Sequence, residues 1–130
     1  MDRAVEWFVA VTAFVIGASH ALRPGDWAET FRRLHQLGRP GAFVNGGPTL
    51  AVGAAIVAGH GSWAWPGAVL TAFGWLLVGK GALCMLAPDA ALRSMERGSR
   101  SPGGFVTAGV VLSLIAGWAC YCLWRGAIGA

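Results

Sequence analysis

Four long apolar stretches, separated by short clusters of charge, constrain this chain more than any other feature of its sequence. The ten basic and six acidic residues lie at 2–6, 23–39, 89–100 and 125, and Lys80 is the one exception. Each intervening stretch offers the roughly 20 mainly apolar residues that a helix needs to cross a bilayer. Charged residues make up only 12% of the chain, whereas soluble domains carry about 25%. The pattern indicates an integral membrane protein and excludes a soluble enzyme, a nucleic-acid-binding protein and a disulfide-framed secreted domain.

We expect a single all-α domain, residues 1–130, with four transmembrane helices. Lipid offers the backbone no hydrogen-bond partner, so an open chain crosses it as helices. The stretches also lack the two-residue alternation of barrel strands. The first stretch has no positively charged leader and no small-residue cleavage site, so we expect it to remain as a helix. The predicted spans are about 4–22, 41–60, 63–87 and 103–124.

The positions of the basic residues predict the orientation, because cytoplasmic loops carry an excess of Lys and Arg. Seven arginines lie in the two long loops, 23–39 and 88–101, whereas Arg3 and Arg125 are the basic residues beside the opposite span ends. We therefore predict cytoplasmic long loops and periplasmic N- and C-termini. The aromatic residues that then fall at the outer interface, where such rings are enriched, are Trp7, Trp63, Trp65, Tyr121 and Trp124.

Each long loop contains a pattern typical of a short amphipathic helix. After Pro24, the residues Trp27, Phe31, Leu34 and Leu37 recur at helical spacing. A weaker copy of the pattern follows Pro88 and ends at a glycine, as the first one does. We expect both segments to lie on the cytoplasmic membrane surface as interfacial helices.

The two halves of the chain match at an offset of 64 residues, which indicates an internal repeat. Each copy consists of a span, a proline, a surface helix, a glycine and a second span, at about 4–61 and 63–126. Because each copy crosses the membrane twice, we expect tandem hairpins of the same topology, related by an axis near the membrane normal. The matched pairs are Gly17 with Gly81, Ala18 with Ala82, Leu22 with Leu86, Pro24 with Pro88, Arg33 with Arg97 and, after a two-residue gap, Gly47 with Gly109 and Leu50 with Leu112.

Residues 70–128 combine an apolar span with Gly and Leu, a proline after a short apolar turn, a brief basic segment and a Gly-rich second span. In this order they resemble the YjeT-like family of small bacterial inner-membrane proteins. Members of that family are single hairpins, so the resemblance implies that two hairpins are fused in this chain. It also implies a bacterial cytoplasmic (inner) membrane location, and it carries over no activity.

Strongly polar groups inside a membrane are costly, so they are the first candidates for a functional site. Lys80 lies eight residues before Pro88, which places it about 12 Å below the cytoplasmic interface at 1.5 Å per residue. His20 lies four residues before the matching proline, and Asn45 begins the NGGP segment of the second span. Lys80 could instead extend its ammonium to the headgroups, and His20 could be an interfacial residue at a helix C-terminus. His60, beside the outer turn, is interpreted as interfacial.

The NGGP segment predicts an irregular start to the second span. A helix beginning at Pro48 would leave about 13 residues, or roughly 20 Å, to cross about 30 Å of hydrocarbon. We therefore expect a kinked or broken helix, whose free amides could receive an anionic or carbonyl group. The resulting ligand-binding hypothesis combines His20, Asn45, Gly46, Gly47 and Lys80. The alternative is a packing kink satisfied by neighbouring helices.

No pattern in the sequence predicts catalysis, a cofactor or a metal site. No Asp or Glu is expected inside a span, which disfavours a proton-coupled exporter. Small residues at spacing four in 51–59, 104–108 and 113–117 allow close helix contact. We therefore expect a non-enzymatic accessory or scaffold subunit that packs against a larger membrane complex or a copy of itself. The alternative is a binding or transport protein for a lipid, quinone or small anionic metabolite in the cytoplasmic leaflet.

Overall fold

The computed structural model describes residues 2–129, which form six helices and contain no strand. The connections between successive helices are only one or two residues long, except for the turn between α3 and α4. The elements are α1 Asp2–Leu22, α2 Pro24–Gln36, α3 Arg39–Gly59, α4 Ala68–Leu86, α5 Pro88–Ser99 and α6 Pro102–Ile128.

Four of the helices, α1, α3, α4 and α6, are long and apolar enough to cross a membrane. The predicted all-α fold with four helices of transmembrane length and composition is confirmed. The third span begins later than expected, at Ala68 rather than near Trp63. The reason is Pro66, since the residue before a proline is biased away from helical backbone angles. Trp63 and Trp65 therefore lie in the turn between α3 and α4.

The helix break expected at NGGP is absent. Helix α3 continues from Arg39 to Gly59 with Pro48 inside it, and its 21 residues are long enough to span a bilayer. Proline removes only one backbone donor. The hydroxyl of Thr49 donates a hydrogen bond of 2.9 Å to the carbonyl of Asn45 in the same turn. Gly46 and Gly47 both lie inside the continuous helix, so neither marks an interruption. A Cβ on Gly47 would meet nothing within 4 Å.

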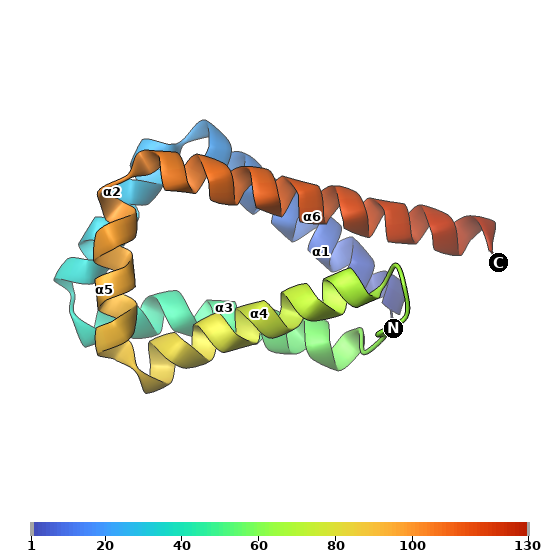
Figure 1. Ribbon diagram of the computed structural model, residues 1–130, viewed down its shortest axis with the longest axis horizontal. Helices are drawn as coiled ribbons and strands as arrows, with labels where there is room; N and C mark the ends of the chain where they lie inside the picture. The colour runs from blue at the N-terminus through green and yellow to red at the C-terminus, as the bar shows by residue number, and fades with distance from the viewer. Residues whose placement is uncertain (1, 130) are drawn as a thin grey trace.

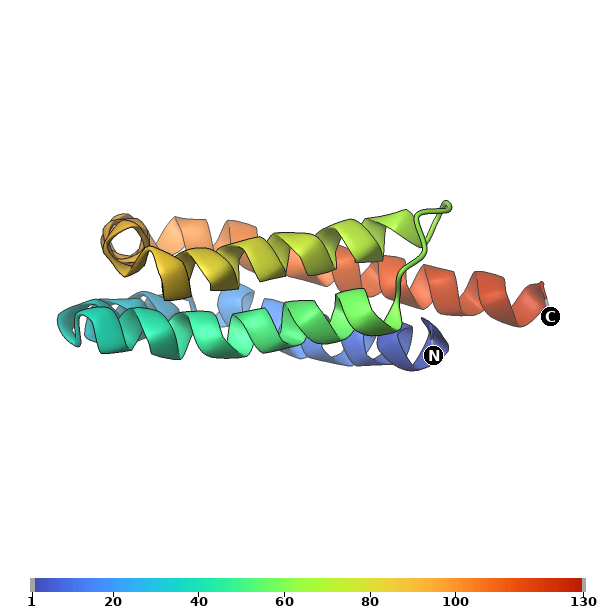
Figure 2. The same cartoon turned by 90° about the horizontal axis from the view of Figure 1, so that it is seen from below.

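The helices form two arms joined at one end (Figure 1). Helix α1 packs along α6 to make the first arm, and α3 packs along α4 to make the second. Helices α2 and α5 lie side by side across one end of both arms, and we call this pair the base. Figure 2 shows that α1, α2 and α3 form one layer and that α4, α5 and α6 form the other.

The arms converge at the end opposite the base, which we call the apex: the turn 60–67 and the adjoining ends of the four long helices. The main buried core lies towards this end and draws side chains from all four. Its buried residues are Val9, Ala10, Ala13, Ile56, Leu70, Ala116, Ala119 and Cys122. A second small core, Ala42, Cys84 and Ala91, joins the second arm to α5 at the base. The arms are thus tied together at both ends.

Glycines set the close approach of the helices within each arm. A Cβ on Gly109 would lie 2.6 Å from the carbonyl oxygen of Gly17, and one on Gly53 would lie 2.9 Å from that of Gly74. A Cβ on Gly81 would lie 2.6 Å from the backbone nitrogen of Leu50. Of the small residues singled out from spacing alone, Ser113 lies at the contact with Gly17 and Gly59 packs against Val5 of α1. The others lie elsewhere: Ala51 and Ala55 are exposed, Gly104 and Ala108 line the space between the arms, and a Cβ on Gly117 would meet nothing.

Gly81→Ala tests this packing, with Gly79→Ala on the same helix as its matched control. The added methyl at position 81 meets backbone atoms of α3, so we expect it to lower the free energy of unfolding by about 1–3 kcal/mol. The methyl at position 79 meets nothing within 4 Å. Because Ala favours helices over Gly by up to about 1 kcal/mol, this variant should be neutral or stabilised. Thermal unfolding in detergent, followed by circular dichroism, measures both variants. Equal shifts in the two would contradict the assigned contact.

Candidate ligand-binding cleft

A cleft of about 780 Å³ lies between the arms, which is within the usual size range of small-molecule sites. Most of its lining is apolar. Several lining residues, among them Val44, Pro48 and Val111, are exposed, so the cleft is open at its side. The apolar side chains that line it include Ile16, Val52, Ile56, Phe73, Leu77, Val111 and Leu112.

The structure brings three of the five predicted site residues together. His20 from α1, Asn45 from α3 and Lys80 from α4 all line the cleft. They also line a smaller adjoining hollow of about 340 Å³ that extends towards α5 and includes Ser94 and Met95. The three polar side chains therefore lie where the two hollows meet. These residues come from three different spans, whose neighbours in space could not be predicted from hydropathy and charge.

Gly46 and Gly47 do not line either hollow. Gly46 is buried between α3 and α4, where a Cβ would collide with Cys84. Gly47 has open space on the side where its Cβ would be. Since α3 is unbroken, the amides of these glycines belong to the helix and do not form the anion-binding turn that we expected from NGGP. That part of the hypothesis is wrong, because the helix accommodates Pro48.

Lys80 is the cation of the cleft. Its ammonium extends towards the base, with Nζ 6.0 Å from the centroid of the Phe31 ring on α2, at the outer limit of a cation–π contact. The Lys80 side chain is exposed, and within residues 2–129 no carboxylate forms an ion pair with it. The cleft thus presents a positive charge whose partner is not supplied by the described chain.

His20 is held in one orientation by its surroundings. Because a carbonyl can only accept, the ring donates from Nδ1 to the carbonyl of Ile16 at 2.8 Å. The ring also stacks on Trp27, with centroids 3.9 Å apart. Trp27 is fixed in turn by a hydrogen bond of 2.9 Å from its Nε1 to the hydroxyl of Ser19. The remaining ring nitrogen, Nε2, is the atom that His20 has available for a ligand.

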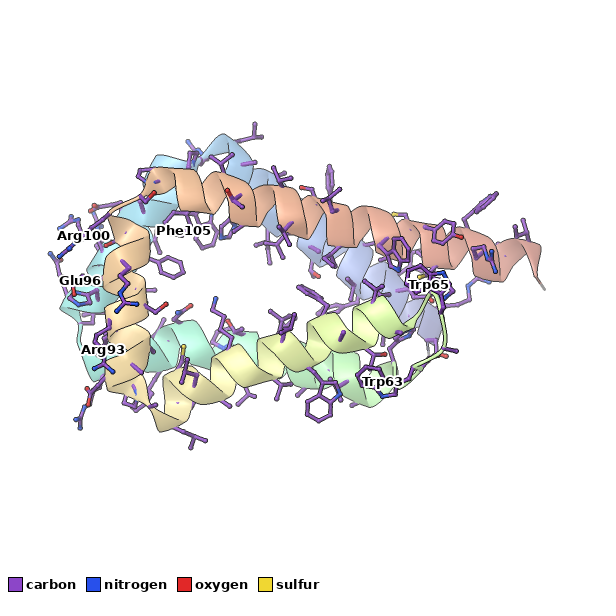
Figure 3. All side chains as sticks on the ribbon, in the orientation of Figure 1. Trp63, Trp65, Arg93, Glu96, Arg100 and Phe105 are labelled. Atoms are coloured by element: carbon purple, nitrogen blue, oxygen red, sulfur yellow. The ribbon has the colours of Figure 1, made fainter. Side chains whose placement is uncertain are left out.

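An aromatic wall completes this corner, and the sequence analysis missed its role. Phe31 packs edge-on against Phe105 with centroids 5.1 Å apart, and Phe105 also faces the ring of His20 at 6.0 Å. Figure 3 shows Phe105 near the corner where α5 meets α6. The spacing of Trp27 and Phe31 correctly placed both on one face of a helix. That face contacts the first arm instead of being wholly available to lipid.

Asn45 is only weakly engaged by the protein. Its amide nitrogen lies 3.9 Å from the sulfur of the buried Cys84, a long contact with a weak acceptor. The amide can therefore reorganise to meet a ligand at little cost. Together, Asn45, His20 and Lys80 supply hydrogen-bonding capacity and one positive charge beside a large apolar volume. This arrangement fits an amphiphile whose polar end is anionic.

Neither a metal centre nor a catalytic group is evident in the part of the chain that the structure describes. Within residues 2–129, no group of three His, Cys, Asp or Glu side chains could hold a metal ion. The expectation that no acidic residue lies inside a span is wrong: Glu6 belongs to α1 and is 9% exposed. Glu6 already falls inside the predicted span 4–22, and it is buried because α1 is packed from its second turn onwards.

Ion pairs stabilise the base. Glu29 on α2 accepts hydrogen bonds from Arg32 and Arg33, which lower the pKa of its carboxyl to about 2. Arg39, at the start of α3, makes two hydrogen bonds to Asp89 on α5, at 3.2 and 3.3 Å. Arg100, just after α5, forms a further ion pair with Glu96 on α5. Figure 3 shows these two residues and Arg93 at the outer side of the base.

No family model matches the chain, and no curated protein or solved structure is similar to it.

The hydrogen bonds from Arg32 and Arg33 to Glu29 predict the pH range in which the Glu29 carboxyl gains a proton. Since the pKa of the folded state lies below the ordinary 4.5, the contribution of Glu29 to stability is present above that value and is lost as the pH falls through about 2. The carboxyl ¹³C resonance of Glu29 should therefore titrate near pH 2. Replacing both Arg32 and Arg33 by Gln should return its midpoint towards 4.5. A wild-type midpoint already near 4.5 would show that these hydrogen bonds do not form.

Proposed function

We propose that this protein binds an anionic amphiphile, with the anionic group at Lys80 and Asn45, a hydroxyl of the polar end donating to Nε2 of His20, and the apolar part along the cleft. The observation that carries the proposal is the position of Lys80. It is an ion on a membrane-spanning helix, it has no carboxylate partner in residues 2–129, and it lies at one end of an apolar volume of about 780 Å³.

The energetics favour a charged ligand over a neutral one. Placing a lysine within a membrane span costs roughly 2.5–3.5 kcal/mol on insertion scales. An anion beside the ammonium offsets part of this cost through a charge-assisted hydrogen bond. The apolar lining contributes about 25 cal/mol for each Å² of ligand surface that it removes from water. A phosphate or carboxylate on a single apolar chain satisfies both requirements.

The orientation proposed from the sequence is consistent with this arrangement. The seven arginines of the two long loops all lie at the base, in α2 and α5 or beside their ends, where four acidic residues, Asp26, Glu29, Asp89 and Glu96, offset part of their charge. The apex carries two basic residues, Arg3 and Arg125, and two acidic ones, Asp2 and Glu6. With a cytoplasmic base, both termini lie in the periplasm and the polar end of the cleft lies in the cytoplasmic leaflet.

The proposed duplication is supported by matching contacts. In the proposed repeat, α1 corresponds to α4 and α3 corresponds to α6. The pair α1·α6 therefore corresponds to the pair α4·α3, and these two pairs are the two arms. The contact of Gly17 with Leu112 in the first arm likewise corresponds to the contact of Gly81 with Leu50 in the second. An axis running from base to apex would relate the halves. With the resemblance to YjeT-like hairpins, these matches support two fused hairpins, each with a short interfacial helix, in a bacterial inner membrane.

A scaffold role remains the second candidate, and one surface favours it. Helix α3 presents an exposed row of small residues, Ala51, Ala54, Ala55 and Ala58. Such rows let the helix of a partner approach closely in a membrane. A larger membrane complex or a second copy of the chain could pack there. This role and ligand binding use different faces of the molecule.

Retention of matched lipids tests the binding proposal. Lysophosphatidate is anionic and lysophosphatidylcholine of the same acyl chain is zwitterionic. We expect the wild-type protein to retain the former preferentially in native mass spectrometry. Lys80→Met should weaken this retention by about tenfold or more, the equivalent of about 1.4 kcal/mol, and Lys80→Arg should preserve most of it.

Arg93→Met is the matched control, because it removes an exposed cation of α5 that does not line the cleft. It should leave retention unchanged. Equal losses in Lys80→Met and Arg93→Met would point to general attraction between charges and would contradict the site. Co-isolation of a larger partner in fixed stoichiometry, without preference between the two lipids, would favour the scaffold role.

Cysteine accessibility tests the proposed orientation. In a Cys120→Ser background, Ser101→Cys lies at the base and Gly61→Cys lies in the apical turn, and both positions are exposed. In intact cells, a membrane-impermeant maleimide should label position 61 and should label position 101 only after the inner membrane is permeabilised. The opposite order would invert the topology.

A further inference from the structure

The apex contains a buried histidine that the binding proposal does not use. His60 is 2% exposed, although it was interpreted from the sequence as an interfacial residue. Its Nε2 lies 3.1 Å from the carbonyl oxygen of Gly67 in the same turn. Since that oxygen can only accept, Nε2 carries a hydrogen and donates it. The second nitrogen, Nδ1, is inaccessible to solvent and has no hydrogen-bond partner within residues 2–129.

The turn prevents the ring from moving to another partner. Thr71 on α4 places its hydroxyl 3.0 Å from the carbonyl of His60 and 2.6 Å from that of Ser62. The indole of Trp118 on α6 donates to the carbonyl of Pro66 at 3.0 Å. These contacts fix the turn to both α4 and α6. The orientation of Nδ1 is therefore imposed by the fold.

The charged groups that face His60 come from α1. A carboxylate oxygen of Asp2 lies 3.7 Å from Nδ1. Glu6, four residues further along α1, is close enough for its charge to interact with those of His60, Asp2 and Arg3. Helix α4 carries no ionisable residue before Lys80, which lies towards the base. On α6, the thiol of Cys122 lies within electrostatic range of Glu6, and Arg125 is exposed.

A neutral His60 is mismatched to this environment. With the hydrogen on Nε2, the neutral ring presents a lone pair at Nδ1 to a carboxylate, so that two acceptors face each other. A buried acceptor without a donor is destabilising, because it has lost its hydrogen bonds to water and gained none in the protein. A proton on Nδ1 removes the mismatch, because the ring then donates towards Asp2 and its positive charge is offset by Asp2 and Glu6. Histidine is also the side chain that most readily gains a proton between pH 5 and 8.

We propose that His60, Asp2 and Glu6 form a proton-binding site that fastens the start of α1 to the turn between α3 and α4. The bound proton resides on Nδ1 and comes from the solvent on the side of the membrane that the apex faces. Protonation strengthens the contact between the two arms at the apex, and deprotonation weakens it. This site lies at the opposite end of the arms from Lys80, and the inference does not depend on a ligand in the cleft.

Nitrogen NMR of the full-length protein in lipid nanodiscs tests the proposal. With ¹⁵N-labelled histidine, three imidazoles contribute signals, and the signal of His60 is the one that disappears in His60→Gln. We expect the fraction of His60 that carries hydrogens on both ring nitrogens to be larger at pH 5 than at pH 8. Asp2→Asn should reduce this fraction at pH 5, because it removes an opposite charge within 4 Å of Nδ1.

Asp26→Asn is the matched control, since it removes an equally exposed carboxylate at the base. It should leave the doubly protonated fraction of His60 unchanged. After correction for intrinsic rates, amide exchange in the first turns of α1 should be slower at pH 5 than at pH 8. This difference should be lost in Asp2→Asn. Because the Asp2 side chain is exposed, the substitution should not disturb the fold, so misfolding would not account for the loss. A His60 signal that shows no doubly protonated form at pH 5, or a doubly protonated fraction unaffected by Asp2→Asn, would overturn the proposal.

Discussion

Close contact between helix backbones at glycines is the interaction on which the rest of this structure depends. Lipid provides little hydrophobic force between helices, so their association relies on tight packing. Gly17 and Gly109 bring α1 against α6, and Gly53 and Gly74 bring α3 against α4. These two contacts create stiff pairs of helices instead of four evenly packed ones. The space between the pairs is then left for the base, the apical core and the cleft.

The positions of the spans could be predicted from the sequence because hydropathy and charge are local properties. The pairing of the helices could not, because it depends on which glycine surfaces fit each other across the chain. Lys80, His20 and Asn45 were recognised one by one as costly polar groups, and only the fold brings them into one cleft. Other predictions failed because rules about single residues do not include the packing of neighbouring elements. Helix α3 continues through Pro48, and Glu6 and His60 are buried.

The two polar sites differ in how the protein treats its own charge. At the base end of the cleft, the chain places a cation beside apolar and aromatic walls without a carboxylate partner among residues 2–129. At the apex, it places two carboxylates near a histidine whose Nδ1 has no hydrogen-bond partner among residues 2–129. The first arrangement favours an anion from outside the protein, and the second favours a proton. Each site is thus incomplete in a way that identifies the species it would bind.

The one- and two-residue connections at the base have a consequence for how the cleft is reached. Residue 23 alone joins α1 to α2, and residue 87 alone joins α4 to α5, so the arms cannot spread there without unwinding helix ends. The buried core closes the opposite end. A molecule can then reach Lys80 through the exposed side between the arms or through the smaller hollow beside α5. In the proposed orientation the first route opens to the bilayer, so along it occupancy would follow the mole fraction of the amphiphile in the surrounding leaflet.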